Sequence, residues 1–432
     1  MSMDRHEYIL NLTNQRMADM STSASASSHP HAHHPLALAE RMQSLQPSAT
    51  LAMAARASAM KAEGIDVIDL SVGEPDFPTP QHICAAAEEA IRAGHTKYTP
   101  AAGIPALRKA VAADAARRTG REVKPSQVIV SNGAKHSLHN VFTSLLNPGD
   151  EVIVPTPYWV SYAELVKLAG ARPVLVETRL EDDFKLRPET LAAAVTPATR
   201  MLLLCSPSNP TGVVYSVDEL GALADVVLEK NLAVVSDEIY DQLVFDGRTS
   251  ASFPTLRPGL EERTVVVAGV SKTYSMTGWR IGWTISPEPL AKAMGSLQSQ
   301  ETSNPASISQ YAALAALEGP QDCVQEMCQA FQKRRDLVAA GLQAIPGIRI
   351  PDIGGAFYAF FDMSAHLGKT YGGKQVTNSV EWCEALLEAE QVATVAGSAF
   401  GAEGHVRMSF AASEAKLTDG LARIGRFLAS AE

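Results

Sequence analysis

The chain has 432 residues, of which 46% are hydrophobic and 19% are charged, a globular composition compatible with a large core and two domains. Its formal net charge of −10 argues against nucleic acid or an anionic membrane surface as a partner, because both attract basic proteins. No apolar run approaches the roughly 20 residues of a membrane-spanning helix. The cysteines are scattered without a Cys-x-x-Cys pair, which argues against a disulfide framework or a zinc knuckle and favours the cytoplasm.

Residues 1–35 are expected to form a disordered tail. The segment Ser21–Ser28 consists almost entirely of Ser, Ala and Thr, and the histidine- and proline-rich stretch after it also lacks the apolar period of a stable helix. No secretory signal is expected, because a continuous apolar segment is missing, and Asp4, Glu7 and Asp19 are unlike a transit peptide. The histidines are potential metal ligands, but the composition favours a solvated tail, so no metal site is expected.

Ordered structure is expected from about Leu36. The segment Ala49–Ala62 is predicted to be an amphipathic helix with Ser48 or Thr50 near its N-terminus. The elements predicted after it are a short strand over Ile65–Leu70, a proline-rich loop over Ser71–Pro80, a helix over Gln81–Ala93, a loop over Lys97–Gly103 and a helix over Ile104–Thr119.

From Val128 to about Ile285, short apolar runs alternate with helical stretches. The predicted strands are Val128–Val130, Glu151–Val154, Met201–Cys205, Leu232–Ser236 and Thr264–Ala268. The helices between them include Ala134–Leu146, Tyr158–Ala169 and Val217–Glu229. This alternation predicts an α/β fold with a mostly parallel sheet that helices cover on both faces. Helices, including one long linking helix, are predicted from Pro289 to about Gln343, and a smaller α+β unit over Ile348–Leu428 follows.

Polar residues follow these strands, at the sheet edge where open α/β sheets bind ligands. The first strand leads through Gly133 into a helix N-terminus, whose free N–H groups and dipole can hold a phosphate. The residues that follow the later strands are Tyr158 and Trp159, then Asn209, then Asp237 and Tyr240, and finally Lys272 and Arg280.

Each of these residues also has an ordinary structural explanation, such as core packing for Trp159 or a turn for Asn209. Together they supply what pyridoxal phosphate needs: a phosphate cradle, a stacking ring, hydrogen-bond donors, a carboxylate and an amine. A lysine that follows a buried strand is costly unless it is bonded or covalently used. Lys272 is therefore the expected attachment point of that cofactor.

The segment Ser271–Gly282 resembles the pyridoxal-phosphate lysine segment of the class I aminotransferases. Asn-Pro-Thr-Gly at 209–212 and Ser-Asp-Glu-Ile-Tyr at 236–240 fit the same pattern. The motifs that resemble the bacterial aspartate aminotransferase branch are Pro-Ser-Ala-Thr at 47–50, Gly-Glu-Pro-Asp-Phe at 73–77, Pro-Tyr-Trp-Val-Ser-Tyr at 157–162 and His-Val-Arg-Met-Ser-Phe at 405–410. The resemblance covers the chain from about Leu36 to the C-terminus.

The resemblance implies fold type I, in which a large domain with a mostly parallel seven-stranded sheet between helices is joined to a smaller α+β domain. The corresponding ranges are 81–320 for the large, cofactor-binding domain and 321–432 for the small one, with the segment 36–80 packing against the small domain. A homodimer with shared active sites is also implied, in which Tyr98 reaches the phosphate of the neighbouring subunit.

The resemblance also implies a role for each site residue. Lys272 forms the Schiff base and moves the substrate proton, Asp237 pairs with the ring nitrogen, and Tyr240 bonds the 3′-oxygen. Further cofactor contacts are implied for Asn209 at the 3′-oxygen, Trp159 against the ring, and Arg280, Ser271, Gly133, Ala134 and Lys135 at the phosphate. The substrate α-carboxylate is expected at Arg407 in a bidentate geometry that lysine cannot copy, beside the backbone of Gly73 and near Trp159 and Asn209.

The implied reaction converts L-aspartate and 2-oxoglutarate to oxaloacetate and L-glutamate. Lys135, with Ser48 and Thr50, is expected to bind the side-chain carboxylate. The alternative for Lys135 is a solvated lysine, but a lysine at a helix N-terminus opposes the helix dipole, which favours function.

Two positions depart from the family pattern. Gly269 stands where many relatives have a serine at the phosphate site, so Ser271 or the backbone must compensate, or one donor is lost. Members that also accept prephenate usually have a lysine where this chain has Gln46, which weakens that assignment without excluding it.

Other functions remain as alternatives. A prephenate, aromatic or other amino-acid aminotransferase, or a β-lyase, would share the same cofactor shell. A non-catalytic sensor is disfavoured because Lys272, Asp237 and Arg407 are all present. A nicotinamide-dependent dehydrogenase is disfavoured because no Gly-x-Gly-x-x-Gly follows a strand.

Overall fold

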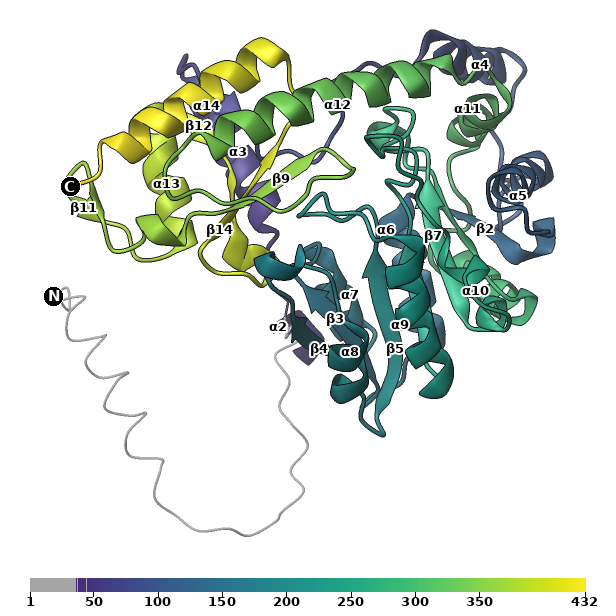
Figure 1. Cartoon of the computed structure of the whole chain (residues 1–432). Coiled ribbons are helices and arrows are strands. Elements are labelled where there is room, and N and C mark those ends of the chain that lie inside the picture. The colour runs from purple at the N-terminus through teal and green to yellow at the C-terminus, as the bar shows by residue number, and fades with distance from the viewer. Residues whose placement is uncertain (1–35, 37, 44) are drawn as a thin grey trace, which may run out of the picture. The chain divides into compact units, whose positions relative to one another are not determined.

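The computed structural model describes residues 36, 38–43 and 45–432 (Figure 1). The predicted disordered tail, 1–35, lies outside the described residues. The chain divides into a unit that ends at Gln43 and a compact unit from Ser44 to Glu432, and each is described by itself. In the first unit, helix α2 spans Glu40–Gln43.

A seven-stranded sheet dominates the compact unit. Its strands, in order across the sheet, are β2 (Val128–Ser131), β8 (Gly282–Ile285), β7 (Thr264–Gly269), β6 (Ala233–Asp237), β5 (Thr199–Cys205), β3 (Glu151–Thr156) and β4 (Arg172–Glu177). Neighbouring strands from β7 to β4 pair in parallel, whereas β8 runs antiparallel to both of its neighbours, β2 and β7. The predicted α/β class and mostly parallel sheet are confirmed.

Helices cover both faces of this sheet. They are α4 (Gln81–Arg92), α5 (Pro105–Thr119), α6 (Ala134–Leu145), α7 (Ser161–Leu168), α8 (Pro188–Ala194), α9 (Val217–Glu229), α10 (Glu288–Glu301) and α11 (Ser307–Glu318). Alternate strand residues face opposite sides, as strand geometry requires: Ile129 packs with residues of α6 and α10, whereas Val128 and Val130 pack with residues of α5 and α11. The apolar runs of the sequence are therefore strands buried on two sides.

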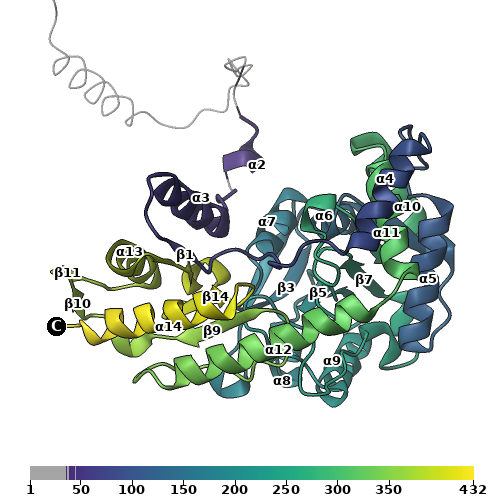
Figure 2. The same ribbon diagram turned by 90° about the horizontal axis from the view of Figure 1, so that it is seen from above.

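A smaller α+β region follows the long helix α12 (Asp322–Gln343), which leads from α11 towards it (Figures 1 and 2). Its antiparallel sheet has the order β13 (Val395–Ala396), β14 (His405–Ser409), β9 (Tyr358–Asp362), and its helices are α13 (Ser379–Glu390) and α14 (Glu414–Ala429). Two short strands, β10 (Thr370–Tyr371) and β11 (Lys374–Gln375), form a separate antiparallel pair. Figure 2 shows α12 and α14 side by side.

The segment before α4 contacts this smaller region. Helix α3 (Ala49–Ala62) is followed by β1 (Ile68–Asp69), which pairs in parallel with β12 (Val392–Ala393). Buried Ala57 of α3 packs with Leu387 of α13 and Ala393 of β12. In the part of the chain that the structure describes, no helix combines the length and the apolar character that crossing a membrane requires.

The structure differs from the sequence prediction in four places. Strand β4 was not predicted, because it is an edge strand that carries Pro173 and leaves Leu175 48% exposed, so it has no buried apolar run. Strand β8 was also not predicted, because it is only four residues long and starts at a glycine. The strand predicted over Ile65–Leu70 shortens to β1, and α7 begins at Ser161 instead of Tyr158.

Candidate active site

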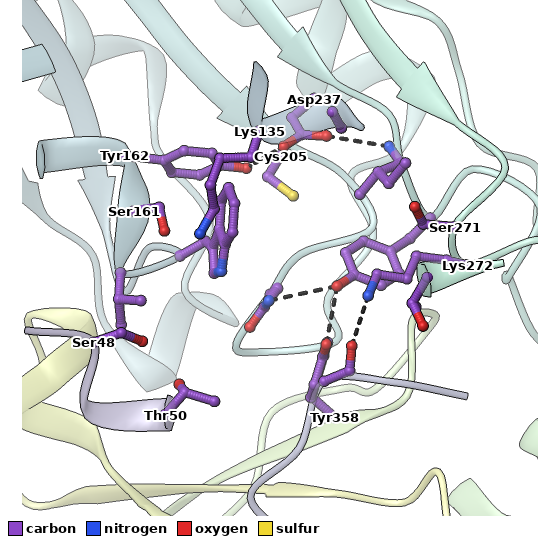
Figure 3. Close-up of a pocket in the computed structure, with 18 of the residues that line it drawn as sticks. Ser48, Thr50, Lys135, Ser161, Tyr162, Cys205, Asp237, Ser271, Lys272 and Tyr358 are labelled. Atoms are coloured by element: carbon purple, nitrogen blue, oxygen red, sulfur yellow. Dashed lines mark hydrogen bonds between the residues drawn. The ribbon is translucent and has the colours of Figure 1, made fainter. Parts of the chain in front are cut away.

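A cavity of about 250 Å³ lies at the sheet edge formed by the carboxyl ends of the parallel strands (Figure 3). The predicted site residues that line it are Ser48, Thr50, Gly73, Ala134, Lys135, Trp159, Asn209, Asp237, Tyr240, Ser271, Lys272, Arg280 and Arg407. These residues come from the N-terminal segment, from loops after five strands of the large sheet and from β14. The fold therefore brings together residues that are more than 300 positions apart in the sequence, such as Thr50 and Arg407.

Lys272 lies in the turn after β7, and its Nζ donates a hydrogen bond to the backbone oxygen of Gly73 at 2.6 Å. Protein surrounds the side chain, although it remains accessible from the cavity. This burial lowers the pKa of Lys272 to about 8, and the carboxylates of Glu74 and Asp237 oppose that shift. A lysine with this pKa has an appreciable uncharged fraction near neutral pH, as a nucleophile or a base requires.

Asp237 ends β6 and is 3% exposed. The hydroxyl of Tyr162 donates to its Oδ2 at 2.7 Å, and the backbone N–H of Ile239 donates to its Oδ1 at 3.2 Å. Burial raises the pKa of Asp237 to about 6, although both hydrogen bonds and the charge of Lys272 act in the opposite direction. The carboxylate is thus oriented by two donors but lacks a full counter-charge until a cation reaches it from the cavity.

This balance predicts a stability effect in protein without cofactor. Because the native pKa of Asp237 exceeds the unfolded value of about 4, the native state binds the proton more tightly. The carboxylate therefore destabilises the native state above about pH 6, and this cost disappears below about pH 4. We expect Asp237→Asn to raise the free energy of unfolding by about 1–3 kcal/mol at pH 7 and by much less at pH 4.

Urea denaturation of the two proteins at pH 7, 5.5 and 4 measures this difference. Asp246→Asn is the matched control of opposite sign, because its hydrogen bond with Arg335 lowers the pKa of Asp246. That substitution should destabilise the protein at neutral pH, with a smaller effect as the pH falls. An Asp237→Asn protein that is less stable than its parent at pH 7 would contradict the expectation.

The backbone at the N-terminus of α6 lies close to the guanidinium of Arg280. Gly133 has a φ of +84°, and a Cβ atom there would collide with the Arg280 guanidinium. The backbone N–H groups of Ala134 and Lys135 have no acceptor within the helix, because the first turn of any helix leaves its donors free. Arg280 is oriented by the backbone oxygen of Thr277, to which its Nη1 donates at 2.8 Å. These donors converge on one end of the cavity and form an anion cradle.

Gly269 does not line the cavity, whereas Ser271 does. A Cβ atom at Gly269 would lie 2.9 Å from the Cα of Gly282 and from the oxygen of Ile281 in the adjoining segment. A serine at this position would therefore require that segment to move, which explains the departure from the family pattern. Among the two candidate hydroxyl positions, only Ser271 is available to an anion.

Arg407 lies on β14 and is 1% exposed. Its Nη1 donates to Oδ1 of Asn209 at 3.0 Å, and its Nη2 donates to the backbone oxygen of Ser71 at 2.6 Å. The guanidinium also lies 4.6 Å from the ring centroid of Tyr358, and its buried Nε has no partner. No carboxylate pairs with this buried cation among the described residues, so an anion in the cavity would complete it.

The wall of the cavity across from Lys272 holds Lys135, Ser48, Thr50 and Ser161 (Figure 3). The Nζ of Lys135 lies 4.9 Å from the ring centroid of Trp159. Burial lowers the pKa of Lys135, and the charge of Arg280 acts in the same direction. The cavity therefore has cations at three separate places, Arg280, Arg407 and Lys135, which suits a ligand set with several anionic groups.

The sequence matches one family over most of the chain. Residues 65–424 match the family described as aminotransferase class I and II. The chain belongs to the class I and II aminotransferases. The aspartate aminotransferase of Geobacillus stearothermophilus is 49% identical to this aminotransferase over 391 residues, 90% of this chain and 98% of the relative.

Other relatives agree with this assignment. The aspartate/prephenate aminotransferase of Cereibacter sphaeroides is 47% identical over 91% of this chain and 98% of its own. The crystal structure of the aspartate aminotransferase from Rhizobium meliloti, with 45% identity, superposes with a TM-score of 0.88 and covers 92% of this chain and 100% of that one. The aminotransferase therefore has the fold type I architecture that the sequence motifs implied.

Sequence reasoning missed several residues of this aminotransferase site, among them Tyr162, Cys205 and Tyr358, which also line the cavity. Tyr162 lies inside one of the family motifs, and Cys205 ends a predicted strand. Both positions could have been predicted, because ligands bind at the carboxyl ends of the strands. Tyr358 carries no such signal, because it lies within a run of buried aromatic residues that resembles an ordinary core strand. Tyr98 is 91% exposed and is not among the residues that line the cavity of its own chain.

Proposed function

We propose that this aminotransferase moves the amino group of L-aspartate to 2-oxoglutarate, giving oxaloacetate and L-glutamate, with pyridoxal phosphate as its cofactor. The observation that carries the proposal is the convergence of Lys272, Asp237 and Arg407 on one cavity. Close relatives named aspartate aminotransferases, with 46–49% identity over about 90% of the chain, support the choice of substrate.

The residues of the cavity fit this cofactor. The cradle at Gly133, Arg280 and Ser271 can accept a phosphate, and a side chain at Gly133 would fill it. Asp237 offers a buried carboxylate to a protonated ring nitrogen, and the hydroxyl of Tyr240, 3.5 Å from Nδ2 of Asn209, offers a donor to a phenolate oxygen. Trp159 supplies the flat surface for stacking.

When bound, pyridoxal phosphate supplies the electron sink that stabilises negative charge at the substrate Cα. Lys272 is the proposed attachment point, and its Nζ is the base that removes the proton from Cα. Asp237 stays ionised beside the ring nitrogen and keeps the proton on it. The guanidinium of Arg407 binds the α-carboxylate and fixes the orientation of the Cα–H bond relative to Lys272.

Lys135, Ser48 and Thr50 are the proposed partners of the side-chain carboxylate of aspartate. Lys135 forms no ion pair with a carboxylate in the described part of the chain. Its contact with Trp159 holds the ammonium over the cavity. The same position also adjoins the phosphate cradle, so Lys135 contributes to the field that attracts dianionic ligands.

A further part of the proposal concerns the domain organisation of the chain. We infer a tail over 1–35, an N-terminal segment over 36–80, a large domain over 81–320 and a small domain over 321–432. The pairing of β1 with β12 supports packing of the N-terminal segment against the small domain. We also infer a homodimer with shared active sites; the 91% exposed side chain of Tyr98, which does not line the cavity of its own chain, is available to a neighbouring subunit. The cytoplasm is the proposed location.

A half-reaction tests the substrate assignment. Protein reconstituted with pyridoxal phosphate should be yellow, and L-aspartate alone should bleach the visible band and release oxaloacetate in stoichiometric amount. An unchanged spectrum with L-aspartate, together with bleaching by another amino acid, would overturn the assignment. A panel that includes L-glutamate, L-phenylalanine and L-alanine identifies the preferred donor.

A second candidate is an aminotransferase that also accepts prephenate. The relatives named aspartate/prephenate aminotransferases, at 47% and 43% identity, favour it. Gln46 weighs against it, because this residue is uncharged at the position where members that accept prephenate usually have a lysine. Formation of arogenate from prephenate and L-aspartate would establish this activity.

A further inference from the structure

Tyr358 is the first residue of β9 and is 1% exposed, yet its hydroxyl reaches the cavity (Figure 3). It comes from the smaller sheet, whereas Tyr240 and Asn209 come from loops of the seven-stranded sheet. The proposed function assigns no role to this buried phenol.

The hydroxyl of Tyr358 contacts the phenol that is proposed to bind the cofactor oxygen. The two hydroxyls of Tyr358 and Tyr240 are 2.9 Å apart and share a hydrogen bond, and the rings meet edge to face with centroids 5.9 Å apart. Within the described residues, the one other hydrogen bond of the Tyr240 hydroxyl comes from Nδ2 of Asn209 at a longer 3.5 Å. Tyr358 is therefore the stronger constraint on where the Tyr240 hydroxyl points.

The ring of Tyr358 contacts the arginine that is proposed to bind the substrate carboxylate. The Arg407 guanidinium carbon lies 4.6 Å from the ring centroid, within the range of a cation–π interaction. Both side chains are almost fully buried, so the contact is shielded from water. One residue thus contacts the proposed cofactor-oxygen donor with its hydroxyl and the proposed substrate clamp with its ring.

The backbone holds Tyr358 at this junction. The N–H groups of Gly354 and Gly355 both donate to the oxygen of Gly212 at 2.9 Å, which ties the Asn209–Gly212 turn to the start of β9. A Cβ atom at Gly212 would lie 2.7 Å from the oxygen of Tyr358, and one at Gly73 would lie 2.6 Å from its hydroxyl. The two glycines at these positions therefore leave room for Tyr358.

We propose that Tyr358 is a positioning residue that couples the two halves of the site: its hydroxyl orients Tyr240 towards the cofactor oxygen, and its ring supports Arg407 for the substrate carboxylate. The inference rests on the proposed function, because it takes the roles of Tyr240 and Arg407 from it. Tyr358 itself touches neither the reacting carbon nor the proton that moves.

The test compares Tyr358→Phe, which removes only the hydroxyl, with Tyr358→Leu, which removes the ring as well. The first readout is the pH midpoint of the visible absorbance of the holoenzyme without substrate. The second is the dissociation constant of maleate, an unreactive dicarboxylate. Tyr215→Phe is the matched control, because it removes a buried hydroxyl that accepts from the N–H of Leu186 outside the cavity.

Tyr358→Phe should shift the midpoint in the same direction as Tyr240→Phe, by about 0.3–1 pH unit, with maleate binding changed by less than about twofold. Tyr358→Leu should shift the midpoint equally and weaken maleate binding by about 2- to 30-fold. In the Tyr240→Phe background, Tyr358→Phe should cause no additional shift, because its hydroxyl acts through Tyr240.

Three results would overturn the inference. They are an unshifted midpoint in Tyr358→Phe, an equal shift in Tyr215→Phe, and a shift that adds in full to that of Tyr240→Phe. Absence of the visible band in the parent protein is a different outcome, because it overturns the proposed function and this inference with it. If the parent protein shows the visible band and Tyr358→Phe does not shift its pH midpoint, only this inference is overturned.

Discussion

Replacing Lys272 with alanine should lower kcat for L-aspartate by about 10⁴-fold or more, because one substitution removes both the proposed attachment point and the base at Cα. The second amine of the cavity, Lys135, belongs to α6 and is proposed to bind the side-chain carboxylate. Asp237 is held by donors from Tyr162 and Ile239. The guanidinium groups of Arg280 and Arg407 are hydrogen-bond donors only and offer no base.

The loss should be confined to chemistry. The Lys272 side chain makes one hydrogen bond, to the oxygen of Gly73, and its removal relieves a buried amine whose pKa burial has lowered to about 8. We therefore expect unchanged far-ultraviolet circular dichroism and an unfolding free energy equal to or above that of the parent. Lys416→Ala, at an exposed position of α14, is the control for a lysine lost elsewhere. Steady-state rates within tenfold of the parent for Lys272→Ala would contradict the mechanism.

The central strands and most of the site were predictable from local patterns. The runs Val128–Val130 and Thr264–Ala268 are apolar without alternation, which is typical of strands buried on two faces. Parallel strands also end at a common edge, so residues after each strand converge without any knowledge of tertiary contacts. This rule was sufficient for Lys272, Asp237 and Asn209, which the structure places around one cavity.

Other features depend on contacts that no local pattern contains. The edge strand β4 exists because β3 offers it a hydrogen-bonding partner, although Pro173 and exposed Leu175 read locally as a loop. Arg407 and Tyr358 reach the cavity only because β14 and β9 pair with each other and the smaller sheet meets the larger one. Family motifs could place Arg407, but Tyr358 had no motif and was visible only in the structure.

Tyr98 is a case that a single chain cannot complete. Its side chain is 91% exposed and does not line the cavity of its own chain, so the single chain shows no role for it. The resemblance to a dimeric family assigns it to the neighbouring site, and this assignment stays a prediction.

Replacing Arg407 should cause the second large effect, a loss of substrate recognition. The buried guanidinium is proposed to bind the α-carboxylate, and truncating one partner of a buried, hydrogen-bonded charge pair costs about 2–5 kcal/mol. This corresponds to a fall of about 30- to 5,000-fold in kcat/KM for L-aspartate with Arg407→Ala. Arg407→Lys should recover only part of it, because an ammonium cannot copy the planar fork that also bonds Asn209 and Ser71.

The specificity ratio separates this role from a general disturbance of the site. β-Alanine is L-aspartate without its α-carboxylate, so it cannot use Arg407 in the parent protein. We expect Arg407→Ala to lower kcat/KM for L-aspartate while changing the value for β-alanine by less than about threefold. The ratio of the two kcat/KM values should therefore fall by nearly the same factor as kcat/KM for L-aspartate.

Arg426→Lys is the control, because this arginine is 57% exposed and forms an ion pair with Glu390 in the smaller region. It should leave kcat/KM for both substrates unchanged, because an exposed ion pair contributes little. If Arg407→Ala lowered kcat/KM equally for L-aspartate and β-alanine, Arg407 would be supporting the cavity and not binding the α-carboxylate. The unpaired Nε and the absence of a carboxylate partner among the described residues favour a selective loss of activity with L-aspartate. A buried cation in this state is stabilised only when an anion binds to it.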